Sequence, residues 1–152
     1  MKDEFKIYLK NLADTKNLAK KIAKIVLPKS LILIRGKLGV GKTTLAKYLI
    51  NSLSQKNIIV PSPSFPIVNT YEFPQLKIWH YDLYRLKKKN DIFELDIELA
   101  LMDCVIIEWP EIVEDLLPKK RIDISIEEDN SYSRFAVISH IRGKSDQLRL
   151  KL

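Results

Sequence analysis

The spacing of apolar and polar residues predicts strands and a helix in the first part of the chain. Residues 5–9 alternate between apolar and polar side chains, as in a half-buried strand. Apolar residues over 12–25 recur at helical spacing, and Pro28 follows them. The continuous apolar run over 31–34 ends at Gly36, which is typical of a central strand that is buried on both faces.

The next stretch predicts a helix and three further strands. From Thr43 onward, leucines repeat along one helical face. A short apolar run over 58–60 predicts a strand, and the proline-rich segment 61–66 ends it because prolines lack an amide donor. Two strand-like runs, 67–73 and 76–82, are separated by a Pro-Gln pair and so predict a hairpin.

The second half of the chain predicts one helix and three more strands. A short helix is expected over 91–101, and the apolar run 105–107 predicts a buried strand. Alternating patterns over 121–127 and 132–140 predict two strands at the end. Strands that alternate with helices indicate a three-layer α/β fold with a mostly parallel central sheet, to which the hairpin and the tail add antiparallel strands.

Length and composition narrow the class of protein. The chain has 152 residues, 46% hydrophobic and 30% charged, which predicts a single domain spanning residues 1–152. No apolar run approaches the roughly 18 residues of a membrane span, and the first ten residues lack the apolar core of a signal peptide, so we expect a cytoplasmic protein. The lone Cys104 excludes an intramolecular disulfide and a cysteine-based metal cage.

Positive charge is concentrated in the first part of the chain. Residues 1–60 hold 13 Lys or Arg against three Asp or Glu, whereas residues 61–152 hold 13 against 16. This excess favours an anionic partner such as a nucleotide or RNA. A generally lysine-rich composition is the plainer explanation, since 20 of the 26 basic residues are Lys.

One motif carries specific chemistry. Residues 36–43, GKLGVGKT, match the phosphate-loop pattern GxxxxGK[ST] between an apolar strand and an amphipathic helix. Backbone N–H groups of such a loop and the positive end of the following helix bind a phosphate. The residues expected to bind nucleotide here are Gly36, Leu38, Gly39, Val40, Gly41, Lys42, Thr43 and Thr44. Lys42 would bridge the β- and γ-phosphates, Thr43 would ligate Mg²⁺, and Thr44 would reach the α-phosphate.

Two carboxylates follow apolar strands, where a magnesium ligand is expected. Glu108 ends the strand at 105–107, and Asp82 ends the strand at 76–82. We expect Glu108 to ligate the metal and Asp82 to orient the attacking water. The alternative is that each carboxylate caps the helical turn that follows it.

The identity of the nucleotide follows from an absence in the sequence. No [NT]KxD tetrapeptide for reading guanine occurs, so ATP is the expected nucleotide. A small metabolite kinase is the runner-up, although the chain has few residues left for an arginine-bearing lid. A basic RNA-binding module with a vestigial phosphate loop is a third reading.

Four motifs together resemble a known family. GKLGVGKTT (36–44), SPSF (62–65), HYDLYR (80–85) and IEWPE (107–111) are similar to the TsaE family, formerly YjeE. The resemblance implies a P-loop NTPase-like fold and an ATPase of bacterial tRNA threonylcarbamoyl-adenosine modification. It also implies that the protein acts with the TsaB–TsaD pair. Hydrolysis of ATP would support repeated turnover of that complex.

The resemblance also assigns residues. It implies that Lys42, Thr43 and Thr44 contact phosphate and Mg²⁺, that Glu108 is the second Mg²⁺ ligand, and that Asp82 is the motif acid. It implies a switch-like loop near the γ-phosphate and contacts to adenine; the switch residues are Ser62, Ser64 and Phe65, and the adenine contacts are Thr15 and Arg134. Lys37 and Ser64 depart from the usual Asp and Thr of the family.

Several residues keep alternative roles. His80 is expected to be packed or hydrogen-bonded in its strand, with the positioning of Asp82 or the nucleotide site as the alternative. Trp109 is equally a core residue or a lid or partner anchor at the site. Arg85 would anchor Asp82 or a partner, or supply a transition-state charge. Because no catalytic glutamine or arginine finger stands out, we expect slow hydrolysis that a complex accelerates.

Overall fold

The computed structural model describes residues 2–141, which form one seven-stranded sheet. Its strands, in the spatial order β1-β7-β6-β2-β5-β4-β3, are β1 (Lys2–Tyr8), β7 (Arg134–Ile141), β6 (Ile122–Glu128), β2 (Leu31–Gly36), β5 (Cys104–Glu108), β4 (Leu76–Asp82) and β3 (Val68–Phe73). The four central strands β6, β2, β5 and β4 are parallel, whereas β7, β1 and β3 pair antiparallel with their neighbours.

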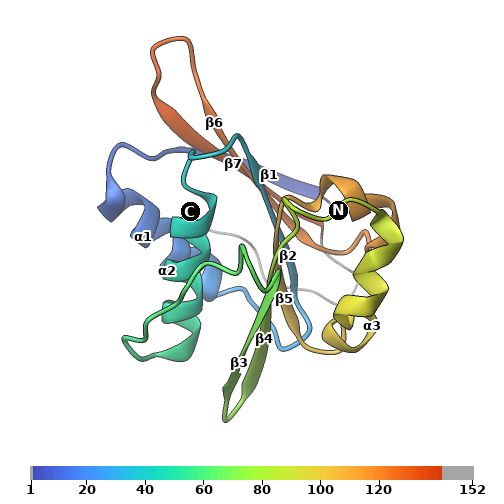
Figure 1. Cartoon of the computed structure of the whole chain (residues 1–152). Helices are drawn as coiled ribbons and strands as arrows, with labels where there is room; N and C mark the ends of the chain where they lie inside the picture. Colours follow the sequence, from blue (N-terminus) through green and yellow to red (C-terminus); the bar gives the residue numbers. More distant parts are fainter. Residues whose placement is uncertain (1, 142–152) are drawn as a thin grey trace.

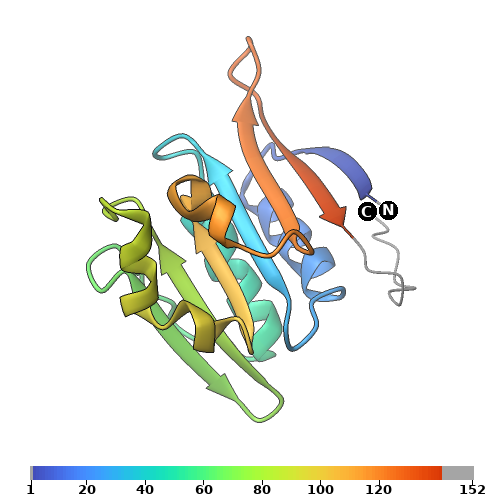
Figure 2. The same cartoon turned by 90° about the vertical axis from the view of Figure 1, so that its right-hand side faces the viewer.

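Helical segments cover both faces of the sheet (Figure 1). One face carries α1 (Leu12–Ala23) and α2 (Lys42–Ser54), and the other carries η1 (Lys89–Leu95), α3 (Ile97–Ala100) and η2 (Pro110–Leu116). Figure 2 shows the β6–β7 hairpin extending beyond the rest of the sheet. The predicted three-layer α/β fold is therefore confirmed. Within residues 2–141, no helix has both the length and the apolar character needed to cross a bilayer.

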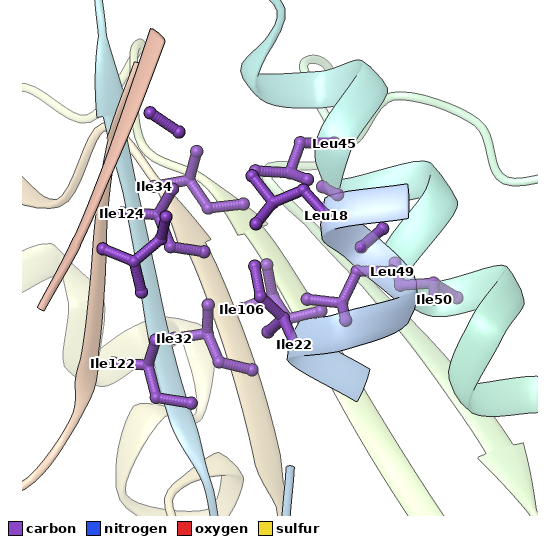
Figure 3. Packing of buried hydrophobic residues seen from close by; sticks show 14 of the residues in the cluster. Leu18, Ile22, Ile32, Ile34, Leu45, Leu49, Ile50, Ile106, Ile122 and Ile124 are labelled. Atoms are coloured by element: carbon purple, nitrogen blue, oxygen red, sulfur yellow. The ribbon is translucent and has the colours of Figure 1, made fainter. Parts of the chain in front are cut away.

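Two apolar cores explain the unbroken apolar run of β2. Ile32 and Ile34 face α1 and α2, where Leu18, Ile22 and Leu49 pack against them (Figure 3). Leu31 and Leu33 belong to the opposite core, beneath η1, α3 and η2. Because both faces of the strand are buried, successive residues are all apolar instead of alternating.

The strand predicted over residues 58–60 is wrong. This segment joins α2 to β3 without strand pairing, and β3 instead occupies the edge of the sheet. The amide of Ile58 donates to Asn51 Oδ1 at 2.7 Å, so a side chain of α2 takes the place of a ladder partner. Ile58 and Val60 pack on the core, while Ile59 is 94% exposed. The two packed residues are therefore apolar because they hold an irregular segment against the core, not because they form a strand.

The single helix predicted over 91–101 is also wrong in its continuity. Asp96 adopts a left-handed conformation, with φ of 60°, and separates η1 from α3. The carbonyl of Leu95, just before this break, accepts a 2.6 Å hydrogen bond from the buried Tyr81 hydroxyl. The carbonyl at the end of η1 therefore has a hydrogen-bond donor from a distant strand, which a local sequence pattern does not reveal.

Burial makes Cys104 unreactive. The Cys104 side chain is fully buried, and burial raises the pKa of its thiol to about 12. We expect a thiol reagent at pH 8 to leave the native protein unmodified and to react once urea unfolds it. Absorbance of the released chromophore measures this, and rapid labelling of the native protein would contradict the buried position.

The same burial affects stability at alkaline pH. In the unfolded chain the thiol ionises near its ordinary pKa of 9.0, so between pH 9 and 12 unfolding releases a proton. The contribution of this thiol is therefore fully present below pH 9 and is lost as the pH rises toward 12. The urea midpoint should fall less steeply over this range in Cys104→Ala than in the parent, and equal slopes would contradict the prediction.

Candidate functional site

The parallel register brings three distant segments together at one edge of the sheet. Glu108, the last residue of β5, lies opposite Ile34 of β2 on one side and opposite Asp82 of β4 on the other. The glycine-rich loop leaves β2 two residues after Ile34. Both carboxylates expected from the sequence therefore lie beside this loop, at the carboxyl ends of the strands, where open α/β sheets bind their ligands.

Glycine is required where the loop begins and where it ends. A Cβ atom on Gly36 would lie 2.7 Å from the backbone oxygen of Ile126, and the φ of Gly36 is +149°. Gly41, with φ of +115°, precedes the first residue of α2. The chain can therefore curl tightly and present the free N–H groups at the start of α2 to an anion.

Lys42 is held inside the loop by its backbone and by an aromatic ring. Its Nζ donates to the carbonyls of Gly36 and Lys37, at 2.8 and 2.7 Å, and lies 4.1 Å from the centre of the Trp109 ring. Burial lowers the pKa of Lys42, while Glu108 and other nearby acids oppose that shift. A phosphate that enters the loop would compete with these carbonyls for the ammonium group.

Glu108 is a buried carboxylate whose two oxygens both have partners. Its side chain is 1% exposed. The Thr43 hydroxyl donates to Oε1 at 2.6 Å, and His80 Nε2 lies 2.7 Å from Oε2. These contacts compensate the cost of removing the carboxylate from water.

Thr43 and Glu108 fit a magnesium ion that also binds phosphate. Neighbouring ligands of an octahedral Mg²⁺ lie about 3 Å apart, so this hydroxyl and carboxylate need only a small separation to share one ion. Among residues 2–141 there is no cluster of three or more His, Cys, Asp or Glu suited to hold a metal. The remaining ligands would come from phosphate and water, as is usual for Mg²⁺.

Asp82 joins the site to the proline-rich segment. Its Oδ1 accepts from the Tyr84 amide at 3.1 Å, and its Oδ2 accepts a long 3.4 Å hydrogen bond from the Ser64 hydroxyl. Ser64 in turn lies 2.8 Å from the Ser62 hydroxyl. A movement of this segment would therefore change the hydrogen bond that Ser64 donates to Asp82.

A pocket of about 260 Å³ gathers most of the residues expected to bind phosphate and metal. It is lined by Leu38, Gly39, Gly41, Lys42, Thr43, Thr44, Ser64, Asp82, Tyr84, Glu108 and Trp109. Gly36 and Val40 line a different pocket, together with residues 125–128 of β6. Ser62 and Phe65 do not line the 260 Å³ pocket, and the exposed Phe65 ring packs against Arg85 instead, 4.4 Å away.

Thr15 and Arg134, the expected adenine contacts, share another pocket of about 500 Å³. The pocket lies between the start of α1 and the start of β7, and Arg134 Nη1 donates to the carbonyl of Val40 in the phosphate loop at 3.2 Å. One guanidinium thus connects this pocket with the loop. This pocket therefore lies next to the glycine-rich loop.

The sequence did not identify the contact partners of His80, Tyr84 and Trp109. Trp109 has a left-handed backbone, with φ of 57°, and its ring lies 4.8 Å from that of Tyr84 and over Lys42. Trp109 also packs against the apolar core beneath η1, α3 and η2, so the ring both borders the pocket and contacts the core. His80 is fully buried against Glu108 instead of Asp82. The sequence did hold one indication that His80 lies near the site. His80 is two residues from Asp82 on β4, and residues at that spacing share a face of the strand.

The mixed sheet, with a glycine-rich loop between β2 and α2, is a P-loop NTPase-like fold. It is similar to the crystal structure of Bacillus subtilis YdiB, with a TM-score of 0.74 and 25% identity, over 93% of this chain and 88% of YdiB. The family model of the threonylcarbamoyl adenosine biosynthesis protein TsaE matches residues 9–136. The chain belongs to the TsaE family, and the resemblance expected from its four motifs is confirmed.

Individual relatives agree with this assignment. A Rickettsia bellii protein is 40% identical over 74% of this chain and 79% of its own length, and a Rickettsia conorii protein is 36% identical over 90% and 79%. A Bacillus subtilis protein is 29% identical over 91% of this chain and 87% of its own length. Each of the three is named tRNA threonylcarbamoyladenosine biosynthesis protein TsaE.

Proposed function

We propose that this chain binds ATP with Mg²⁺ and hydrolyses the ATP in support of threonylcarbamoyl-adenosine formation on tRNA. The observation that carries the proposal is that Lys42 and Thr43, at the start of α2, line the same pocket as Asp82 and Glu108. This is the residue set that phosphoryl transfer requires: phosphate donors, a metal-binding hydroxyl and two carboxylates. The names of the relatives support the tRNA-modification process.

Each side chain has a defined task in this proposal. Lys42 exchanges the carbonyls of Gly36 and Lys37 for phosphate oxygens, and its charge is stabilising where negative charge develops. Thr43 and Glu108 would hold Mg²⁺, which neutralises phosphate charge when bound.

Asp82 would orient the attacking water. It lies in the pocket one strand away from Glu108, and its oxygens have only weaker contacts, at 3.1 and 3.4 Å. A carboxylate so placed can accept a proton from water while the phosphoryl group transfers. Ser64, whose hydroxyl contacts Asp82, would connect this step with the position of the proline-rich segment.

The proposed partners are TsaB and TsaD, which would act with this protein in the cytoplasm. Tyr84, which lines the phosphate pocket, is 58% exposed, and Phe65, next to the lining residue Ser64, is 81% exposed. A partner protein that covers these side chains would alter the surroundings of the pocket and so change the rate of hydrolysis. Slow hydrolysis by the isolated chain and faster hydrolysis in the complex are therefore expected.

The test is steady-state release of inorganic phosphate from ATP by the purified protein with Mg²⁺, alone and with TsaB and TsaD. We expect slow turnover alone, a higher rate with both partners, and almost none when EDTA removes Mg²⁺. Absence of ATP binding and hydrolysis under all conditions would overturn the proposal. Transfer of phosphate to a small metabolite would instead support the kinase alternative.

Trp109 should report the arrival of nucleotide. The chain has two tryptophans, and Trp79 is 6% exposed with its indole N–H donated to Asp103, away from the pocket. When Lys42 turns toward phosphate, its charge leaves the Trp109 ring and the fluorescence should change. Most of the ATP-dependent change should disappear in Trp109→Phe and persist in Trp79→Phe. The reverse pattern would contradict this role for Trp109.

A further inference from the structure

His80 makes a direct contact with the proposed metal ligand from the neighbouring strand. Its Nε2 lies 2.7 Å from Glu108 Oε2, and the two side chains are 0% and 1% exposed. Glu108 is opposite Asp82 in the β4–β5 register. His80 lies two residues before Asp82 and therefore on the same face of β4. The contact is therefore built into the pairing of two central strands.

The hydrogen-bonding partners of the imidazole define its tautomer. Nδ1 is buried and has no hydrogen-bond partner among the described residues. A proton on Nδ1 would leave a buried donor without an acceptor and would set the Nε2 lone pair against a carboxylate oxygen. The proton therefore belongs on Nε2, from which the ring donates to Glu108.

This donation divides the two oxygens of Glu108 between two neighbours. Oε2 accepts from His80, while Oε1 accepts from the Thr43 hydroxyl. Rotation of the carboxylate about its last bond would break both contacts. With Oε2 held by a buried ring, Oε1 remains directed at the oxygen with which it would share the metal.

We propose that His80 is a positioning residue, which holds the Glu108 carboxylate in the orientation that binds Mg²⁺ beside the nucleotide. The inference rests on the proposed function and deepens it. Groups that orient metal ligands typically contribute 10- to 100-fold to metal affinity, because they remove the competing orientations of the ligand. His80 itself does not line the phosphate pocket.

Two substitutions separate the hydrogen bond from other effects. His80→Gln places an amide nitrogen as many bonds from Cα as Nε2 is, so it can still donate to Glu108. His80→Asn ends at the level of Nδ1 and cannot reach. His140→Gln makes the same chemical change on β7 and serves as the control.

The measured quantity is the affinity for a fluorescent ADP analogue, with and without Mg²⁺, in the absence of turnover. The ratio of the two dissociation constants gives the Mg²⁺ effect. We expect His80→Asn to reduce this effect by about 10-fold or more, with little change in the Mg²⁺-free affinity. The His80→Gln and His140→Gln variants should keep it. A merely structural defect would weaken binding under both conditions.

A measurement on the unaltered protein covers the case in which His80→Asn does not fold. The chain has only two histidines, so nitrogen-15 NMR of labelled imidazoles, assigned with His140→Gln, reports on His80 directly. We expect the Nε2–H tautomer and a change in the His80 Nε2 signal when Mg²⁺ is added to the ADP-bound protein. An Nδ1–H tautomer, or a signal unchanged by Mg²⁺, would overturn the inference.

The outcomes distinguish the inference from the function on which it rests. If the parent shows an Mg²⁺ effect and His80→Asn shows the same effect, the positioning role is wrong and the proposed function stands. If the parent binds the ADP analogue equally well with and without Mg²⁺, the positioning role is wrong, and release of phosphate from ATP decides the proposed function separately.

Discussion

Replacing Lys42 with alanine is expected to lower ATP hydrolysis by about 100-fold or more, the usual loss when a site loses one of its main donors to developing charge. In the native loop the ammonium is poised over the carbonyls of Gly36 and Lys37, so it needs only a short movement to reach phosphate. The weakened affinity for ATP should appear as a higher KM, and the lost charge as a lower kcat. Phosphate release at a series of ATP concentrations separates the two.

Lys47→Ala is the matched control for this substitution. It removes the same charge from the same helix, but Lys47 lies outside the pocket. Its rate should stay close to that of the parent. Equal rates for Lys42→Ala and the parent would mean that the loop does not bind the transferring phosphate.

Glu108→Gln is expected to lower the rate of Mg²⁺-dependent ATP hydrolysis by about 100-fold, while nucleotide binding without Mg²⁺ persists. The amide keeps the shape of the side chain and an oxygen acceptor, but it has lost the negative charge that draws a divalent cation. Titration of Mg²⁺ at fixed ATP measures the effect as a shift of the half-maximal concentration together with a lower plateau.

The control for Glu108→Gln is a carboxylate outside the site. Glu98, on α3, is exposed and does not line the pocket, so Glu98→Gln should behave as the parent does. An unchanged Mg²⁺ titration for Glu108→Gln would show that the carboxylate is only structural. Asp82→Asn would then be the next variant to examine.

The elements that were predicted well are those whose signals are local. The phosphate loop combines a motif with the strand and helix that flank it, so the order of β2, loop and α2 follows from residues 31–54 alone. The hairpin of β3 and β4 was found because its turn separates two strand-like runs. Glu108 was located at the pocket because it directly follows an apolar run.

The features that were missed depend on contacts between distant segments. The apolar residues 58–60 match a strand pattern, but strand formation needs a free neighbour, and Asn51 already binds the Ile58 amide. Likewise, His80 and Glu108 are 28 residues apart, and only the β4–β5 register brings them together. Without that register, the sequence could not choose between Asp82 and Glu108 as the partner of His80.

The direction of β4 also provides a place for labelling the protein. Asp82 ends this strand at the pocket, so the exposed turn at Pro74 and Gln75 lies at the other end of the seven-residue strand, roughly 20 Å away. Figure 1 shows this end of the β3–β4 hairpin projecting from the sheet. Pairing with β5 holds β4 in place independently of the turn. Because the native thiol of Cys104 is buried, Gln75→Cys would accept a single fluorophore or surface tether and leave the pocket open to nucleotide and protein partners.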